Sequence, residues 1–406
     1  MDDFAREMNW IGARQEEMVR QVREWASINS SSWNVKGLDA MRKMLHHEFS
    51  ILGGEMETID LAPLVVIDGH GESVQIPVGK ALKITKRPQA SLKVFLGGHM
   101  DTVFAEDHHF QEVTQLDDNT LNGPGVADLK GGLAAMLTAL MALERSPHAE
   151  KIGWEVLINP DEEIGSHGSG VLFPGIAERN HIGLIYEPPV DDTGTLAAAR
   201  RGSGNFTMVV RGKAAHAGRE FDKGRNAISL LGEIIVRLHA LNNLYEGITL
   251  NVGRIEGGGA LNIVPDLAIV RFNVRIADSA AEAWMLQKID ELRIEFDARE
   301  GYSVTVDGFF NRSPKPMDQP QQRLFAMVED CGEKLGLKLG SKDTGGCCDG
   351  NDLKAAGLTN VDTLGVRGGK IHSDQEYMRI DSLVERAGLS ALLLFRLASG
   401  DLVWHP

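Results

Sequence analysis

Apolar runs that end at acidic or histidine residues constrain the fold of this chain more than any other feature. Such runs cover residues 92–96, 154–159 and 182–186, and a turn rich in glycine or proline follows each one. Runs of this length are typical of buried β-strands. Open α/β sheets bind ligands just beyond the carboxyl ends of their strands. The pattern therefore predicts a polar site at one edge of a sheet, and the residues that follow the runs are His99, Glu162, Glu163 and Glu187.

Helical patterns alternate with these runs. Apolar residues recur at helical spacing over residues 37–52, a strand-like run covers residues 55–61, and a long apolar helical pattern covers residues 129–143. Asp128 directly precedes the last pattern, where an aspartate is equally expected as a helix N-cap. Alternating strands and helices are typical of an α/β layer. We therefore predict an α/β fold with a largely parallel or mixed sheet.

The pattern changes near residue 193. Six elements follow in the order β-α-β-β-α-β, which is typical of a ferredoxin-like unit. Their ranges are 204–211, 225–241, 248–255, 266–275, 279–297 and 302–307. A proline-rich stretch at residues 309–316 then leads back to α/β character. We therefore predict one domain built from residues 1–193 and 313–406, with residues 194–312 inserted into it as a second domain.

The composition is that of a soluble enzyme of more than one domain. The chain has 406 residues, 43% of them hydrophobic, which is enough for a substantial core. Lys and Arg number 42 against 57 Asp and Glu, so the net charge of −15 argues against nucleic acid or an anionic membrane as a partner. The first residues resemble no signal peptide, and no uninterrupted apolar stretch approaches the roughly 20 residues of a membrane helix. We expect a cytoplasmic protein.

The three cysteines suggest no disulfide framework. Cys347 and Cys348 are adjacent, and Cys331 is distant from both in sequence. A trans peptide holds adjacent Cα atoms about 3.8 Å apart, which is shorter than a disulfide prefers. No catalytic Cys–His signature accompanies Cys348, so we expect a small buried thiol rather than a nucleophile.

Four motifs carry residues suited to metal chemistry. His99 and Asp101 project to the same side of an extended segment, so the histidine could bind a metal while the aspartate orients it. Glu162 and Glu163 point in different directions, so one could bind metal while the other faces a water molecule. Each motif alone also has an ordinary structural explanation, such as a solvated acidic turn or an exposed loop acid. The other two motifs centre on Glu187 and His372.

Five motifs taken together resemble those of one family. They are His99-x-Asp101, Gly-x-Ala-Asp128-x-Lys-Gly-Gly, Glu162-Glu163-x-Gly-Ser, Glu187-Pro and His372-Ser373, in this order. The chain resembles, over essentially its whole length, the zinc metallopeptidase family of glutamate carboxypeptidase, acetylornithine deacetylase and succinyl-diaminopimelate desuccinylase. The resemblance implies a mixed-sheet zinc-exopeptidase-like catalytic domain with an inserted ferredoxin-like domain that forms a homodimer.

The resemblance also implies roles for the motif residues. Asp128 would bridge two zinc ions, which cobalt or manganese could replace because all donors are nitrogen or oxygen. His99 and Glu187 would complete one metal site, and Glu163 and His372 the other. Glu162 would act as general base, and Asp101 would support His99. In the family the peptide after the bridging aspartate is often cis, which here would be Asp128–Leu129.

Residues of the inserted domain match substrate-binding positions of the family. His216, in Ala-His-Ala-Gly, would cross the dimer interface and help to stabilise the oxyanion. Asn262 and Arg275 match positions that contact substrate. Three further arginines could bind a carboxylate, although solvated surface positions are the better prediction for them; they are Arg200, Arg201 and Arg367.

The resemblance thus implies a dinuclear zinc hydrolase of an amide bond in small peptides or N-acyl amino acids. Within this class we expect activity like that of a glutamate carboxypeptidase, and an N-acyl amino acid deacylase is the closest alternative. A non-catalytic homologue that binds metal or peptide is a further alternative, but binding alone does not require Glu162. A nucleotide-binding protein is disfavoured because the chain has no phosphate-binding glycine-rich loop ending in Gly-Lys-Ser or Gly-Lys-Thr.

Overall fold

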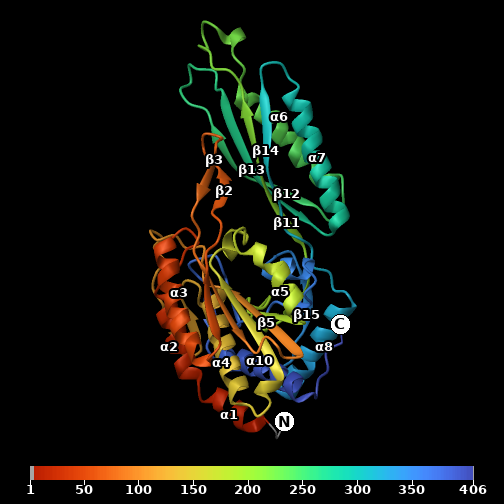
Figure 1. The fold of residues 1–406 in the computed structure, drawn as a ribbon. Helices are drawn as coiled ribbons and strands as arrows, with labels where there is room; N and C mark the ends of the chain where they lie inside the picture. Colours follow the sequence, from red (N-terminus) through yellow and green to blue (C-terminus); the bar gives the residue numbers. More distant parts are fainter. Residues whose placement is uncertain (1–3, 406) are drawn as a thin grey trace.

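The computed structural model describes residues 4–405 and contains two main sheets, each with its own hydrophobic core (Figure 1). The larger sheet is mixed: its last four strands are parallel, and the first two are antiparallel to their neighbours. In pairing order, its strands are β1 (Glu55–Ile59), β4 (Ala81–Lys86), β8 (Ile152–Asn159), β5 (Leu92–His99), β9 (Ile182–Ile185) and β16 (Asn360–Val361). The predicted mixed α/β layer is confirmed.

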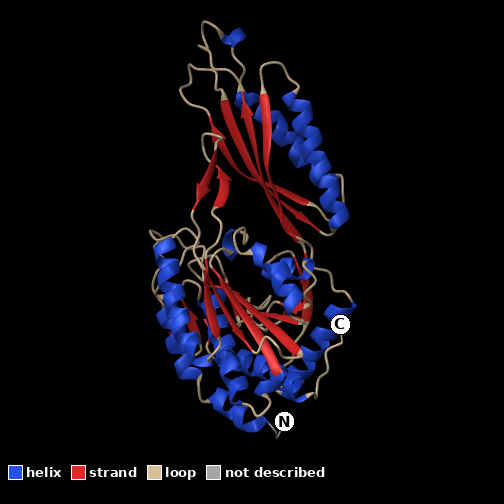
Figure 2. Ribbon diagram, viewed as in Figure 1, coloured by secondary structure: helices blue, strands red, loops and turns tan. Residues whose placement is uncertain are grey.

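Helices cover both faces of this sheet (Figure 2). The main core lies on the face that carries α1 (Ala5–Gly12), α2 (Gln15–Ala26), α3 (Val35–Phe49), α4 (Gly131–Arg145), α8 (Gln319–Lys334) and α10 (Asp381–Ser399). A smaller cluster on the other face includes residues of α5 (Phe173–Arg179) and α9 (Asp349–Ala355). By length and composition, residues 126–145 could cross a membrane, but 94% of that window is buried inside the protein. The segment that contains α4 is therefore the core helix of this domain.

The second sheet is antiparallel and carries two helices on one face. In pairing order its strands are β12 (Thr249–Gly257), β13 (Leu267–Ile276), β11 (Gly202–Arg211) and β14 (Ser303–Arg312), and its helices are α6 (Ala227–Ala240) and α7 (Ser279–Asp297). This is the predicted ferredoxin-like order. β10 (Leu196–Arg200) lies outside the sheet and pairs with β15 (Ser341–Thr344). Residues 309–312, expected in a connecting stretch, instead extend β14.

Besides the β10–β15 pair, two smaller sheets complete the fold of residues 4–405. β6 (Thr114–Asp117), β7 (Thr120–Asn122), β18 (Tyr377–Arg379) and β17 (Gly368–Gly369) form one of them. The other is a hairpin of β2 (Leu64–Ile67) and β3 (Ser73–Ile76), which the sequence patterns did not predict. The hairpin rises from the larger domain to the second sheet (Figure 1). There the Arg211 guanidinium donates to Glu72 Oε1 at 2.5 Å and to the Gly71 carbonyl oxygen at 3.1 Å.

Candidate active site

The five predicted metal ligands lie together at the carboxyl ends of the parallel strands. His99 ends β5, Glu163 lies in the turn after β8, and Glu187 follows β9. Asp128 lies in the tight turn before α4, next to an Asp128–Leu129 peptide bond that is cis, as the resemblance implied. His372 lies in the loop between β17 and β18, with a φ of +62° that is uncommon for a residue other than glycine.

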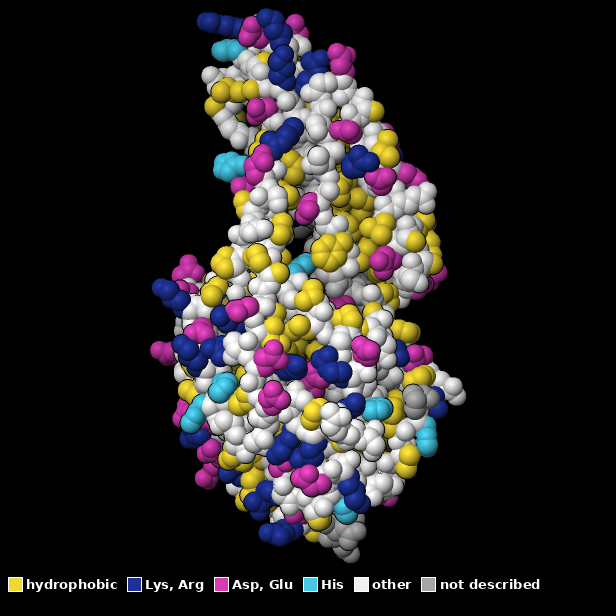
Figure 3. Space-filling view, viewed as in Figure 1, with side chains coloured by type: hydrophobic (Ala, Val, Ile, Leu, Met, Phe, Trp, Pro, Cys, Tyr) yellow, Lys and Arg dark blue, Asp and Glu magenta, His cyan; other side chains and the backbone are white. Residues whose placement is uncertain are grey.

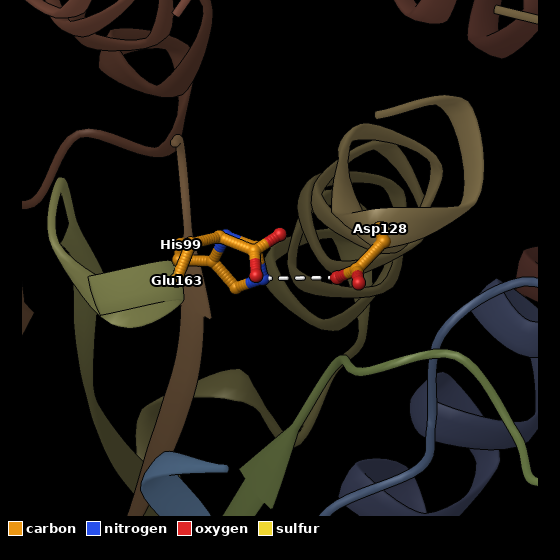
Figure 4. A group of neighbouring side chains, drawn as sticks. All are labelled: His99, Asp128 and Glu163. Atoms are coloured by element: carbon orange, nitrogen blue, oxygen red, sulfur yellow. Dashed lines mark hydrogen bonds and ion pairs between the residues drawn. The ribbon is translucent and has the colours of Figure 1, made fainter. Parts of the chain in front are cut away.

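Asp128 lies between the two histidines. Its Oδ1 is 3.0 Å from His99 Nε2, and its Oδ2 is 3.2 Å from His372 Nε2. Glu187 Oε1 is 3.7 Å from His99 Nε2, and Glu163 Oε2 is 3.1 Å from His372 Nε2. Figure 4 shows His99, Asp128 and Glu163 converging from three separate segments. Each oxygen of Asp128 therefore belongs to a different group of donor atoms.

A glycine allows this approach of α4 to β9. A Cβ at Gly132 would lie 2.2 Å from the Tyr186 carbonyl oxygen, which no other residue could accommodate without a shift. The helix that follows Asp128 can therefore pack directly against the strand that precedes Glu187. The pair of glycines at 131–132 thus has a packing reason in addition to its place in the motif.

The cluster concentrates negative charge in a buried place. Hydrogen bonds to Asp128 and Glu163 raise the pKa of His372 to about 11. Burial raises the pKa of Glu163, and the negative charge of the neighbouring Asp128 raises it further. Burial also raises the pKa of Glu187 to about 8. Four carboxylates lie here, at positions 128, 162, 163 and 187. Within residues 4–405, Arg312 is the one Lys or Arg that forms a salt bridge with any of them.

Cations would offset this charge. Buried carboxylates are costly unless they are paired or bind metal. The donors are carboxylate oxygens and imidazole nitrogens, a set that suits zinc and also cobalt or manganese. Donor atoms of His99, Asp128 and Glu163 lie within 4.8 Å of one another, as do those of His99, Glu162 and Glu187. The residues present therefore fit a centre for divalent metal ions.

Asp101 supports the cluster from beneath. Its Oδ1 lies 3.3 Å from His99 Nδ1, and the carboxylate accepts hydrogen bonds from the backbone N–H groups of Glu162 at 3.2 Å and Glu163 at 3.1 Å. The Ser32 hydroxyl donates to Asp101 Oδ2 at 2.6 Å. Such contacts fix the orientation of a metal-binding histidine. Asp101 thus joins the His99 segment to the Glu162–Glu163 turn.

Arg312 contacts Glu162 and was not identified from the sequence. Its Nη2 donates to Glu162 Oε1 at 2.8 Å, and its Nη1 donates to Asp349 Oδ1 at 2.7 Å and Asp352 Oδ2 at 2.6 Å. The side chain is 3% exposed, so the guanidinium is held by buried partners. Burial raises the pKa of Glu162, and the charge of Arg312 opposes this shift.

Glu376 is a second residue that the sequence did not reveal. It is buried, and its carboxylate accepts hydrogen bonds from three backbone N–H groups of the turn that carries Asp128. The donors are Gly125 at 3.2 Å, Ala127 at 3.0 Å and Asp128 at 3.1 Å. Glu376 lies four residues after His372 in the sequence, but its contacts with this turn become visible only in the folded chain.

A cavity of about 470 Å³ opens over the cluster. Arg275 lines it, and its Nη1 donates to Cys347 Sγ at 2.7 Å. The prediction of a solvated surface position is wrong for Arg200, which lines the same cavity and has an 8% exposed side chain paired with Asp362. The three cysteines are free, and Cys348 is buried as expected.

Arg201 and Arg367 are not among the residues that line this cavity. The guanidinium of Arg201 donates to Thr249 Oγ1 at 3.3 Å. Arg367 forms salt bridges with Asp381 at 2.9 Å and Glu385 at 3.1 Å, and its side chain is 18% exposed. It is therefore an ion-pair partner of α10 rather than a freely solvated side chain.

His216 and Asn262 are not brought to this cavity within one chain. They lie beside each other: Ala217 N donates to the Asn262 carbonyl oxygen at 2.9 Å, and His216 forms a β-bridge with Ile263. Their loops follow β11 and precede β13, at the end of the second sheet farthest from the larger domain (Figure 1). Arg275 lies at the opposite end of β13, next to the cluster.

Comparisons with known proteins agree with this geometry. A model of peptidase family M20/M25/M40 matches residues 95–396. Carboxypeptidase G2 from Pseudomonas sp. (strain RS-16) is 26% identical over 405 residues, which cover 95% of this chain and 90% of that protein.

Solved structures share the fold. A di-peptidase from Saccharomyces cerevisiae has a TM-score of 0.76 at 13% identity, covering 98% of both chains. A dinuclear metal-binding peptidase of the M20 family from Bacillus subtilis has a TM-score of 0.64 at 14% identity, covering 96% of this chain and 99% of that one. The family match spans most of the chain, including every residue from His99 to His372. The chain therefore belongs to peptidase family M20/M25/M40 and is a metal-dependent hydrolase of peptide or amide bonds.

Proposed function

We propose that the protein releases an amino acid with a free carboxylate from a small peptide or an N-acyl amino acid, with activity like that of a carboxypeptidase. The observation that carries this proposal is Arg275. Among the described residues, Arg275 has no carboxylate partner, and its side chain donates only to the sulfur of Cys347. Guanidinium groups bind carboxylates through paired hydrogen bonds. Arg275 is therefore suited to hold the carboxylate of the departing amino acid.

A glutamate-like side chain on the departing residue is favoured by the charge beside Arg275. Arg200 and Lys315 share the single buried carboxylate of Asp362, at 2.8 and 2.7 Å. This group therefore carries excess positive charge, and Arg200 faces the cavity. An acidic side chain in the cavity would complement that charge.

For the reaction we propose two metal ions bridged by Asp128, with His99 and Glu187 on one ion and Glu163 and His372 on the other. Zinc is the first candidate, and cobalt or manganese could replace it. Ions bound there would polarise the scissile carbonyl and make water nucleophilic at neutral pH.

Glu162 would take a proton from the attacking water and deliver it to the leaving nitrogen. Arg312 holds one oxygen of this carboxylate, Oε1, at 2.8 Å. The other oxygen is left to exchange the proton. Arg312 would thus keep the base at a fixed place during the transfer.

Replacing Arg275 by Ala tests the carboxylate site. We expect kcat/KM for N-acyl-glutamate to fall about 10–100-fold, because a hydrogen bond to a charged group contributes about 1.5–3 kcal/mol. Substrates whose α-carboxylate is blocked as an amide should already be poor for the wild type and change little. Arg20→Ala, on the exposed face of α2, is the matched control. Equal wild-type hydrolysis of the free acid and the α-amide would contradict the proposal.

We further propose a homodimer formed through the inserted domain, with His216 of each chain serving the other chain's site. Two observations support it. His216 does not line the metal cavity of its own chain. β12 is an edge strand that carries the exposed Ile255, and Val236 is exposed on the neighbouring helix α6. A two-fold dimer exchanges the same residue between both sites.

Mixed chains test the action of His216 in trans. His216→Ala alone should fold, bind metal and lose about 10²–10³-fold in turnover, the usual effect of removing one oxyanion donor. In a heterodimer with a Glu162→Gln chain, one site regains both groups and the other lacks both. Activity per heterodimer should therefore recover to about half of the wild type. If the subunits exchange and no activity returns, His216 does not act across an interface.

A further inference from the structure

Three large apolar side chains from distant segments are exposed around one cavity outside the metal site. Trp33 is 54% exposed, Val65 is 51% exposed and Phe309 is 56% exposed, and all three line a cavity of about 460 Å³. Figure 3 shows hydrophobic side chains bordering a hollow between the β2–β3 hairpin and the second sheet. Exposed apolar residues that converge from separate elements mark binding surfaces. We call this cavity the apolar groove.

The apolar groove has a polar floor. Strand register places Asn205 opposite both Asn273 and Phe309 on the open face of the second sheet. The Asn273 side chain donates to Asn205 Oδ1 at 2.9 Å, so the amides form a continuous row. Phe309 meets the His167 ring edge-on at 5.4 Å between centroids. The floor therefore presents side-chain amides with an aromatic ring at one end, and Asp307 adds one exposed carboxylate.

The other wall of the groove is the β2–β3 hairpin, and its position is fixed. Besides the contacts of Arg211, the Arg271 guanidinium donates to the Asp68 carbonyl oxygen at 3.3 Å. Arg271 and Arg254 are charged members of the groove, and both pair with Glu256. These cations are thus engaged, and apart from Asp307 and His167 the rest of the groove lining is apolar or uncharged.

The groove is continuous with the metal cavity. Ile164, Asn205 and Asn311 line both of them. Ile164 directly follows the Glu162–Glu163 pair, and Trp33 directly follows Ser32, which donates to Asp101. The metal cavity and the groove are therefore parts of one connected opening.

We propose that the apolar groove binds a bulky apolar group on the acyl side of the scissile amide. The proposal rests on the proposed function, in which Arg275 holds the carboxylate of the departing amino acid and the acyl half extends from the metal cluster through the shared opening. A small acyl group such as acetyl would leave Trp33, Val65 and Phe309 exposed. A benzoyl or naphthoyl group would cover them.

Acyl size is the variable that tests this inference. With the metal-loaded enzyme, kcat/KM for N-(2-naphthoyl)-glutamate and N-benzoyl-glutamate should exceed that for N-acetyl-glutamate by about 10–100-fold, the range that contacts in an apolar pocket give. Trp33→Ala and Phe309→Ala should each lower the ratio of naphthoyl to acetyl hydrolysis about tenfold. The control Ile51→Ala, another exposed apolar residue but remote from the groove, should leave the ratio unchanged.

Binding to the Glu162→Gln variant gives a second readout that does not need turnover. Calorimetry should show tighter binding of N-(2-naphthoyl)-glutamate than of N-acetyl-glutamate, and Phe309→Ala should remove most of the difference. Equal affinity and equal hydrolysis of the two compounds would overturn the groove while leaving the proposed function intact. Tighter naphthoyl binding without hydrolysis by the wild type would support the groove and overturn the proposed function.

Discussion

Replacing Glu162 by Gln is expected to lower turnover about 10²–10⁴-fold, the usual contribution of a positioned acid–base group. The amide oxygen of Gln can still accept the hydrogen bond that Arg312 donates to Glu162 Oε1 at 2.8 Å. It cannot accept a proton from water at neutral pH. The variant should therefore keep its fold, its metal and its substrate affinity, and lose mainly kcat.

Two matched variants make this result specific. Glu163→Gln changes the adjacent carboxylate, which lies 3.1 Å from His372, and should weaken metal binding before it affects chemistry. Glu178→Gln, at an exposed position on α5, should behave as the wild type. Steady-state kinetics with metal analysis of each variant separates these outcomes. Near-normal turnover in Glu162→Gln would show that another group moves the proton.

The second large effect is expected for Asp128→Ala. The two Asp128 oxygens face different histidines, at 3.0 and 3.2 Å, so this substitution removes a donor from both proposed metal sites. Metal content and activity should fall together, with hydrolysis near the uncatalysed background. Asp118→Ala, in the exposed turn between β6 and β7, is the control. A variant at Asp128 that keeps full metal content would contradict the bridging role.

The elements that fix the fold were predictable because their patterns are local. α7 has the bounds Ser279–Asp297 that its periodicity predicts, and Asp278 caps it by accepting a hydrogen bond from Ala281 N at 2.8 Å. The apolar composition of β5, β8 and β9 likewise predicts buried strands. The ligand set came from the resemblance of five motifs to one family, and the strand ends by themselves indicated only His99, Glu162, Glu163 and Glu187; the roles of the residues stay predictions.

The supporting residues could not be predicted because their contacts are distant in sequence. Arg312 donates a hydrogen bond to Glu162, which is 150 residues away in the sequence. The proline-rich pattern around Arg312 predicted a loop rather than the end of a strand. Glu376 accepts hydrogen bonds from backbone N–H groups about 250 residues away in the sequence. Every residue except proline has such a group, so no side-chain motif indicates this contact. The strands of the β2–β3 hairpin have four residues each, and contacts with Arg211 and Arg271 hold the hairpin in place.

The metal content of the wild-type protein tests the central claim most directly. After loading with zinc and removal of free metal, elemental analysis should give about two ions per chain, as expected of a centre in which one carboxylate serves both ions. The same preparation of Asp128→Ala should retain far less. A wild-type chain that binds no more than about one ion in saturating zinc would contradict the two-metal account.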